Sequence, residues 1–339
     1  MTDASSAAKP SATARKRIMA GMRPTGTLHV GHLLGALRNF VDLSQRHDCY
    51  FEVADLHALT TKFERSGEIA ADTRTMVMGW IAAGLDPANC TIYVQSRIPE
   101  ISELYTLLSM VVPVSWLERV PTYKDQIGAL GSEIATHGFL GYPVLQTVDI
   151  AIMKGQGVPV GQDQLPHLEL SREIVRRFNH HYGAVLIEPE AILSETPYVP
   201  GTDGRKMSKS YDNGLMLAET AEQTVARVKT MYTDPTKVHK TDPGHPETCP
   251  VFFFQSAFNP SMAPDIARRC RAGEIGCVED KADMARHLNA ALAPLRERLR
   301  EIEAKPQYVD EVLSDGTKKA RATAQATLAQ VKAAMGLPA

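Results

Sequence analysis

The chain has few cysteines, almost no net charge and no long apolar run, and each shortage excludes a class of protein. The five cysteines are scattered, with no Cys-x-x-Cys pair, which argues against a zinc finger or a disulfide framework and is typical of the reducing cytosol. A formal net charge of −2 means that any nucleic-acid-binding surface must be a local patch. No run approaches a membrane span in length, so we expect no membrane association and a cytoplasmic location.

What remains is the composition of an ordinary globular protein. With 339 residues, 44% of them hydrophobic and 22% charged, the chain is long enough for two domains, each with its own core. Residues 1–16 are small and polar and lack a hydrophobic segment, so we predict a disordered tail. An organelle transit peptide is disfavoured by Asp3 and by the small number of arginines within residues 1–16.

The segment Arg17–Leu43 organises the first half of the chain. An apolar segment, Arg17–Met22, leads into a turn with Gly26 and then into His29-Val30-Gly31-His32, followed by apolar residues at helical spacing. A strand, a glycine-rich turn and a helix form the usual front half of a nucleotide-binding βαβ unit, and free N–H groups at the helix N-terminus suit phosphate. Alternatives are a surface turn and a His-x-x-His zinc pair, which would need further ligands.

Strand and helix signals alternate over the first hundred residues, the pattern from 100 to 179 is mostly helical with one short strand, and helices alone follow residue 213. We predict strands at 17–22, 49–59, 91–95 and 158–161, and helices at 68–83, 101–112, 144–153 and 167–178. Beyond residue 213 the periodicity predicts helices at 219–232, 280–302 and 318–335. The alternation indicates an α/β fold with a doubly wound parallel sheet. We therefore predict a Rossmann-like catalytic domain with a helical insertion at 17–213 and an all-helical domain at 214–339.

A second motif lies in the Gly- and Pro-rich loop 197–210. It reads Lys206-Met207-Ser208-Lys209-Ser210. Alone, such a loop is usually a solvated charged turn, but two ammonium groups and two hydroxyls beside glycines can fold over a polyphosphate.

Together the two motifs resemble the HIGH and KMSKS signatures of the class I aminoacyl-tRNA synthetases. The resemblance covers nearly the whole chain from Arg17 onward. Within that class the sequence is most similar to the tryptophanyl family, and the segments that carry this similarity are GMRPTGTLHVGHLLGAL, WLERVPTYKDQI, YPVLQTVDI and VPVGQDQLPHLELSREIVRRFN. Three positions depart from the family pattern: many members have Asn at His32, Gln162 replaces a usual Glu, and Gln146 precedes Asp149 at a spacing that tyrosyl enzymes use.

The resemblance implies activation of an amino acid by ATP followed by transfer to tRNA. His29, His32, Lys206 and Lys209 would be catalytic. ATP would contact Arg23, Pro24, Thr25, Gly31, His32, Gly161, Gln162, Asp163, Lys206, Met207, Ser208, Lys209 and Ser210. Mg²⁺ would arrive with ATP and need no protein cage.

Asp149 is the residue that best indicates which amino acid is the substrate. A carboxylate within an apolar helix costs several kcal/mol to bury unless it is paired, although it could instead face solvent. By resemblance it accepts the indole N–H of L-tryptophan. The same pocket would include His57, Tyr142, Gln146, Met19, Val158 and Val160. Tyrosine is the rival substrate, but Met19 stands where archaeal and eukaryotic tyrosyl enzymes have a Tyr that binds the substrate hydroxyl.

The helical domain would bind the anticodon of tRNA(Trp). Its basic residues include Lys237, Lys240, Arg268, Arg269 and Arg271, which fit a phosphate-contacting patch. By the family's habit the protein would be a homodimer. Two other classes stay open: a small nucleotidyltransferase, which would lack the second motif, and a non-catalytic RNA-binding paralogue, which would have lost His32, Lys209 or Asp149.

Overall fold

A five-stranded parallel sheet forms the centre of the molecule. The computed structural model describes residues 15–120, 123, 127–128, 131–193 and 198–338, so most of the predicted tail lies outside the described residues. The strands are β1 Arg17–Met22, β2 Asp48–Val53, β3 Cys90–Val94, β4 Gly157–Val160 and β5 Glu190–Leu193. Their order is β3-β2-β1-β4-β5, with every pair parallel. The predicted doubly wound α/β fold is confirmed.

Helices cover both faces of the sheet and continue beyond it. Those of the sheet region are α1 Val30–His32, the π-helical η1 Leu33–Leu37, α2 Arg38–Arg46, α3 Asp55–Lys62, α4 Ile69–Ala82, α5 Pro99–Ser109, α6 Val114–Glu118, α8 His137–Ile152 and α9 Leu165–Tyr182. The later ones are α10 Ala221–Lys229, α11 Pro250–Phe258, α12 Ala263–Arg271, α13 Cys277–Glu303 and α14 Pro306–Ala334. None of the helices in the described ranges has the length and apolarity needed to cross a membrane.

Alternating strand residues divide the interior into two cores, one on each face of the sheet. Ile18 and Phe51 face one way and pack with Trp80 of α4. Met19 and Tyr93 face the other way, toward α5, α8 and α9. Since β1 lies between β2 and β4, the chain reverses its direction of winding there, and ligands of such sheets bind at the carboxyl ends of the strands beside that point.

Two sequence predictions of local structure are wrong. The strand predicted at 49–59 ends at Val53, because the Asp55 carboxylate accepts from the backbone N–H groups of Leu56 (3.0 Å) and Ser96 (2.9 Å) and starts α3. This places His57 on a helix. The helix predicted at 144–153 begins at His137 instead, capped by the Thr136 hydroxyl.

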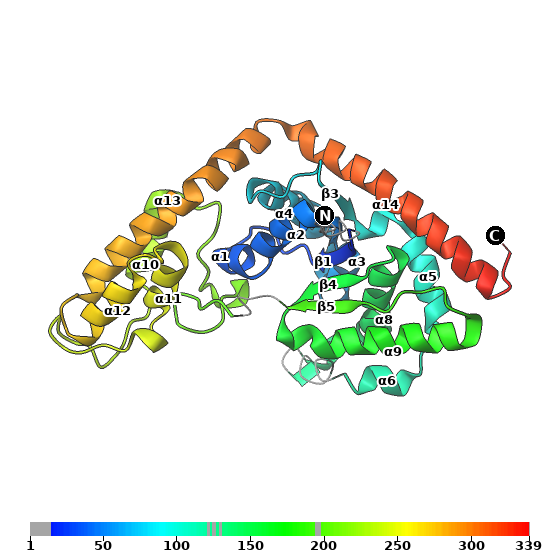
Figure 1. Cartoon of the computed structure of the whole chain (residues 1–339), viewed down its shortest axis with the longest axis horizontal. Helices are drawn as coiled ribbons and strands as arrows, with labels where there is room; N and C mark the ends of the chain where they lie inside the picture. The colour runs from blue at the N-terminus through cyan, green and yellow to red at the C-terminus, as the bar shows by residue number, and fades with distance from the viewer. Residues whose placement is uncertain (1–14, 121–122, 124–126, 129–130, 194–197, 339) are drawn as a thin grey trace, which may run out of the picture.

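The last two helices form a bent roof over the molecule (Figure 1). α13 packs with α10 and α11 at one end, whereas α14 returns to the sheet and packs on β3 and α5. Gly316 touches the backbone of Ile92, and Arg321 donates to the buried Glu100 carboxylate at 2.9 Å. The segment 214–339 is thus helical, but its last helix shares a core with the sheet; the boundary at 213 stays a prediction.

Candidate active site

The first motif forms the turn after β1 and the start of the following helix. Gly26 adopts φ +74°, a backbone conformation that favours glycine. His29 is the N-cap of α1, and its backbone N–H donates to Nδ1 of His32 at 3.2 Å. The two imidazole centroids lie 3.7 Å apart. The motif therefore presents two imidazole rings, tilted by 33° and in close contact, at a helix N-terminus, where a phosphate would be stabilised.

Both imidazoles are uncharged at neutral pH. Burial, reinforced by the Lys209 ammonium, lowers the pKa of His29 to about 4. Burial, together with His29 and Lys209, lowers the pKa of His32 to about 3. Because Nδ1 of His32 accepts a hydrogen bond, a neutral His32 carries its proton on Nε2 and can donate from there.

The second motif packs directly against the first. The backbone N–H of Gly31 donates to the sulfur of the buried Met207 at 3.3 Å, and the Lys209 ammonium donates to the carbonyl of Thr25. Burial lowers the pKa of Lys209, while the nearby Asp72 carboxylate opposes this shift. Lys206 is exposed. The structure thus brings together the signature residues of both motifs, although they are far apart in sequence.

Asn213 holds the loop of the second motif in shape. Its side-chain oxygen accepts from the backbone N–H of Ser208 at 2.7 Å, and its amide donates to Asp203 at 2.7 Å and to the carbonyl of Lys206 at 3.2 Å. The strand-like segment that follows pairs with the first motif, since the N–H of Val30 donates to the carbonyl of Leu215 at 2.8 Å.

A cavity of about 420 Å³ opens beside the two motifs, where β1 and β4 diverge. It is lined by all the residues predicted for the amino-acid pocket, namely Met19, His57, Tyr142, Gln146, Asp149, Val158 and Val160. Arg23 and Gly161, predicted for ATP, also line it. His29, His32, Lys206 and Lys209 lie outside this lining, and of these Lys209 reaches the Thr25 carbonyl. Gln162 and Asp163 are exposed at the start of α9.

Asp149 is buried at 3% exposure, and both of its carboxylate oxygens have hydrogen-bond partners. Nε2 of His57 lies 2.9 Å from Oδ2, and the Gln95 amide donates to Oδ1 at 2.8 Å and to Oδ2 at 3.0 Å. Gln95 is itself oriented by the backbone N–H of Leu56, which donates to its oxygen at 3.1 Å. The carboxylate is therefore a fixed negative acceptor at the cavity wall, with lone-pair capacity left for further donors.

Sequence reasoning missed Glu52, which lines the cavity, and Gln95, which lies outside the lining and binds Asp149. The pattern predicts Gln95 only as the last residue of a strand, and its position at the carboxyl end of β3 was the available signal. Glu52 is a charged residue within the apolar run Asp48–Val53, which is a second such signal because central parallel strands are buried on both faces. Both side chains are fully buried.

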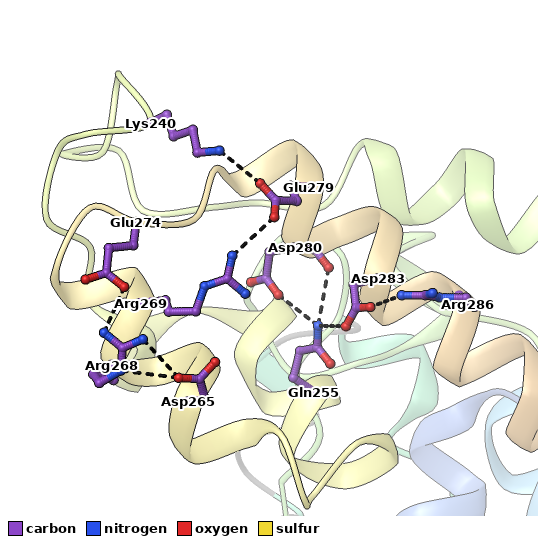
Figure 2. Close-up of polar contacts among 10 residues, drawn as sticks. All are labelled: Lys240, Gln255, Asp265, Arg268, Arg269, Glu274, Glu279, Asp280, Asp283 and Arg286. Carbon is purple, nitrogen blue, oxygen red and sulfur yellow. Dashed lines mark hydrogen bonds and ion pairs between the residues drawn. The ribbon is translucent and has the colours of Figure 1, made fainter.

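The basic residues predicted to contact tRNA lie on the helical region, and acidic partners surround most of them. Figure 2 shows Arg268 with Asp265 and Glu274, and Arg269 and Lys240 sharing Glu279. Arg271 pairs with Glu247. Lys237 is buried, with its ammonium bound to backbone carbonyls, so it does not fit a phosphate-contacting role.

Among the residues that the structure describes, no group of three or more His, Cys, Asp or Glu could hold a metal ion.

Comparison with known proteins gives one consistent family. Residues 11–293 match the family model of tRNA synthetases class I (W and Y). The chain is 48% identical to the tryptophan–tRNA ligase of Thermotoga maritima, over 95% of this chain and 99% of that protein. It is 42% identical to that of Aquifex aeolicus, over 95% and 100%.

Solved structures of tRNA synthetases are also similar to this chain. A tryptophanyl-tRNA synthetase from Campylobacter jejuni, complexed with ADP and tryptophan, superposes with a TM-score of 0.85 at 32% identity and covers 95% of this chain and 100% of that one. A tyrosyl-tRNA synthetase from Archaeoglobus fulgidus reaches a TM-score of 0.66 at 21% identity, a likeness of fold alone.

Proposed function

Because this chain belongs to the class I tRNA synthetases for tryptophan and tyrosine, we propose that it is a tryptophan–tRNA ligase. It activates L-tryptophan with ATP to the adenylate and pyrophosphate, and then transfers the amino acid to tRNA(Trp). The observation that carries the choice of amino acid is the buried Asp149 carboxylate, held by His57 and Gln95 at the wall of a largely apolar cavity.

An indole ring fits the chemistry of this cavity. Its N–H is a donor without acceptor capacity, so one carboxylate satisfies it. Val158, Val160 and Met19 supply apolar surface for the ring faces. A phenol would bring a hydroxyl that both donates and accepts, and Met19 has no group to pair with it.

The phosphates of ATP would lie over the first motif. Neutral His29 and His32 would donate hydrogen bonds there, assisted by the N–H groups at the helix start. Lys209 would leave the Thr25 carbonyl and follow the β- and γ-phosphates as they depart, with Lys206 joining from its exposed position. Gly31, together with Gly161 and its neighbours at the start of α9, would contact the adenosine.

The tryptophan carboxylate is already a nucleophile, so its attack on the α-phosphorus needs no general base. What the chain contributes is positioning and stabilisation of the charge that develops on the phosphates. The groups around the first motif include imidazoles and ammoniums, and the Asp72 carboxylate beside Gly26 pairs with Lys62 at 3.1 Å. This set fits Mg²⁺ held by the phosphates and water, as is usual for that ion.

The helical region would bind tRNA through exposed arginines, and we propose a cytoplasmic homodimer by analogy with the family. ATP–pyrophosphate exchange with purified protein tests the central proposal. We expect exchange with L-tryptophan, little with L-tyrosine, and charging of tRNA(Trp). Equal exchange with tyrosine would contradict the assignment, and no exchange with either would indicate a non-catalytic paralogue.

A further inference from the structure

Glu52 is a buried carboxyl group of the cavity wall that the mechanism above leaves unused. It lies on β2, opposite Gly21 of β1 in the sheet register, and its side chain has 0% exposure. It lines the cavity together with Gly21 and Asp149. A Cβ placed on Gly21 would lie 3.5 Å from Oε1 of Glu52, so the carboxyl group packs against the glycine backbone at the base of the cavity.

Neither oxygen of Glu52 makes a hydrogen bond of good geometry with a described residue, and its polar neighbours are the Tyr93 hydroxyl and the Asp149 carboxylate. The Tyr93 hydroxyl, also fully buried, makes no well-formed hydrogen bond with those residues either. An unpartnered carboxyl in the interior is costly. Such groups persist mainly where a function requires them, and this one borders the cavity proposed to bind the substrate.

The surroundings of Glu52 keep it uncharged. Burial, and then the negative charge of Asp149, raise its pKa well above the ordinary value, with Asp55 adding to the same effect. Two adjacent buried carboxyl groups cannot both ionise. His57 and Gln95 bind the Asp149 carboxylate, whereas Glu52 has no such donors, so Glu52 is the acid with an O–H to donate.

We propose that Glu52 is a positioning residue for the amino-acid pocket: once tryptophan fills the cavity, its carboxyl O–H donates to the Asp149 carboxylate and restricts that carboxylate to the orientation that accepts the indole N–H. The inference rests on the proposed function. His57 holds Asp149 from α3 and Gln95 holds it from the turn directly after β3, and Glu52 would add the third support from β2.

The test compares Glu52→Gln and Glu52→Met in tryptophan-dependent ATP–pyrophosphate exchange. The glutamine amide can donate to Asp149 as the neutral acid does, so the KM for tryptophan should stay within about threefold of wild type. Methionine fills similar space without a donor. Its KM for tryptophan should rise about tenfold or more, as expected for removing a hydrogen bond to a charged acceptor, with kcat and the KM for ATP within about threefold.

Two further measurements separate positioning from packing. Thermal unfolding should show Glu52→Met at least as stable as wild type, because it removes an unpartnered buried acid. Cys49→Ala, on the same strand with its side chain in the other core, should leave the KM for tryptophan unchanged. Adding Glu52→Met to Asp149→Asn should cost little more than Asp149→Asn alone, since Glu52 acts through Asp149.

Several results would overturn the inference: an unchanged KM in Glu52→Met, a Glu52→Gln variant as impaired as Glu52→Met, or effects that add fully in the double variant. Absence of tryptophan-dependent exchange in the wild-type protein would instead contradict the proposed function. The two failures are therefore distinguishable.

Discussion

The backbone N–H of Gly31 donates to the sulfur of Met207 at 3.3 Å, and this hydrogen bond joins two motifs that are far apart in sequence. A Cβ on Gly31 would lie 3.4 Å from that sulfur and 2.8 Å from Nδ1 of His29, so the glycine permits the close approach. The loop of the second motif is thereby held over the proposed phosphate site, with Lys209 bound to the Thr25 carbonyl.

Lys209→Ala should slow adenylate formation while leaving tryptophan affinity nearly unchanged. Lys209 would act on the departing phosphates, where charge develops, more than on bound substrate. Removing one such donor should cost roughly 2 to 4 kcal/mol of transition-state stabilisation. Single-turnover activation measures this effect, with the distant exposed Lys240→Ala as control. An unaffected rate would mean that this loop is not catalytic.

His32→Asn should make the stability of the protein less sensitive to acid. The pKa of His32 is lowered to about 3 in the folded protein, so as the pH falls below about 6.5 the unfolded chain takes up a proton that the folded chain does not. Folding stability then decreases at roughly 1.4 kcal/mol per pH unit for each such group, from about pH 6.5 down to the folded pKa. Asparagine has no proton to take up.

Urea unfolding at pH 6.5, 5.5 and 4.5 measures this difference. His32→Asn should lose roughly 2 kcal/mol less than wild type over the range, and the surface variant His239→Asn is the matched control. Parallel pH curves for wild type and His32→Asn would contradict the neutral, buried state of this imidazole.

Much of the site was predictable because its chemistry lies in local motifs. A turn that must approach phosphate needs Gly26 and Gly31, and a buried carboxylate such as Asp149 stands out within an apolar helix. The residues that orient Asp149 were harder to find. Glu52 is on β2 and Gln95 directly follows β3, and only the pairing of these two strands brings both residues close to Asp149.

β5, α11 and the packing of α14 on the sheet were not predicted, because the local sequence signals in these places are weak or misleading. β5 has four residues at the sheet edge, none of them fully buried, so its apolar pattern is faint. In α11 the run Phe252-Phe253-Phe254 has the composition of a strand, yet it packs as a helix against α13. The return of α14 to the sheet depends on tertiary packing, which periodicity does not report.

Arg268, Arg269 and Arg271 changed together to Gln should weaken tRNA binding and flatten its salt dependence. The log–log slope should fall by roughly 0.7 to 0.9 for each phosphate that the variant no longer neutralises. Because all three pair with carboxylates, those carboxylates would remain and repel phosphate. Tryptophan-dependent ATP–pyrophosphate exchange in the absence of tRNA should persist in this variant. Arg176→Gln, on α9 and paired with Glu169 and Glu188, is the control. An unchanged slope would exclude this patch from the interface.

Gly316→Ala should destabilise the protein although alanine is the better helix former by about 1 kcal/mol. A Cβ on Gly316 would lie 1.7 Å from the carbonyl oxygen of Ile92, and the β3 backbone cannot yield without disturbing the sheet. Such overpacking should cost roughly 1 to 3 kcal/mol. Urea midpoints measure the change, and the exposed Ser314→Ala on the same helix should be neutral or slightly stabilising. A Gly316→Ala protein as stable as wild type would refute the docking of α14 on β3.

Asp149→Ala should reduce tryptophan specificity far more than it affects ATP binding. The indole N–H gives up its water on entering the cavity, and a charged acceptor restores that bond at about 1.5 to 3 kcal/mol. The variant would also leave His57 and Gln95 without the acceptor they now share. Asp149→Asn should be intermediate, because its oxygen still accepts but its amide faces the Gln95 donor. We would measure kcat/KM for tryptophan and tyrosine on wild type and both variants, with Thr147→Val on the same helix as control. Unchanged selectivity in Asp149→Ala would show that another group recognises the indole.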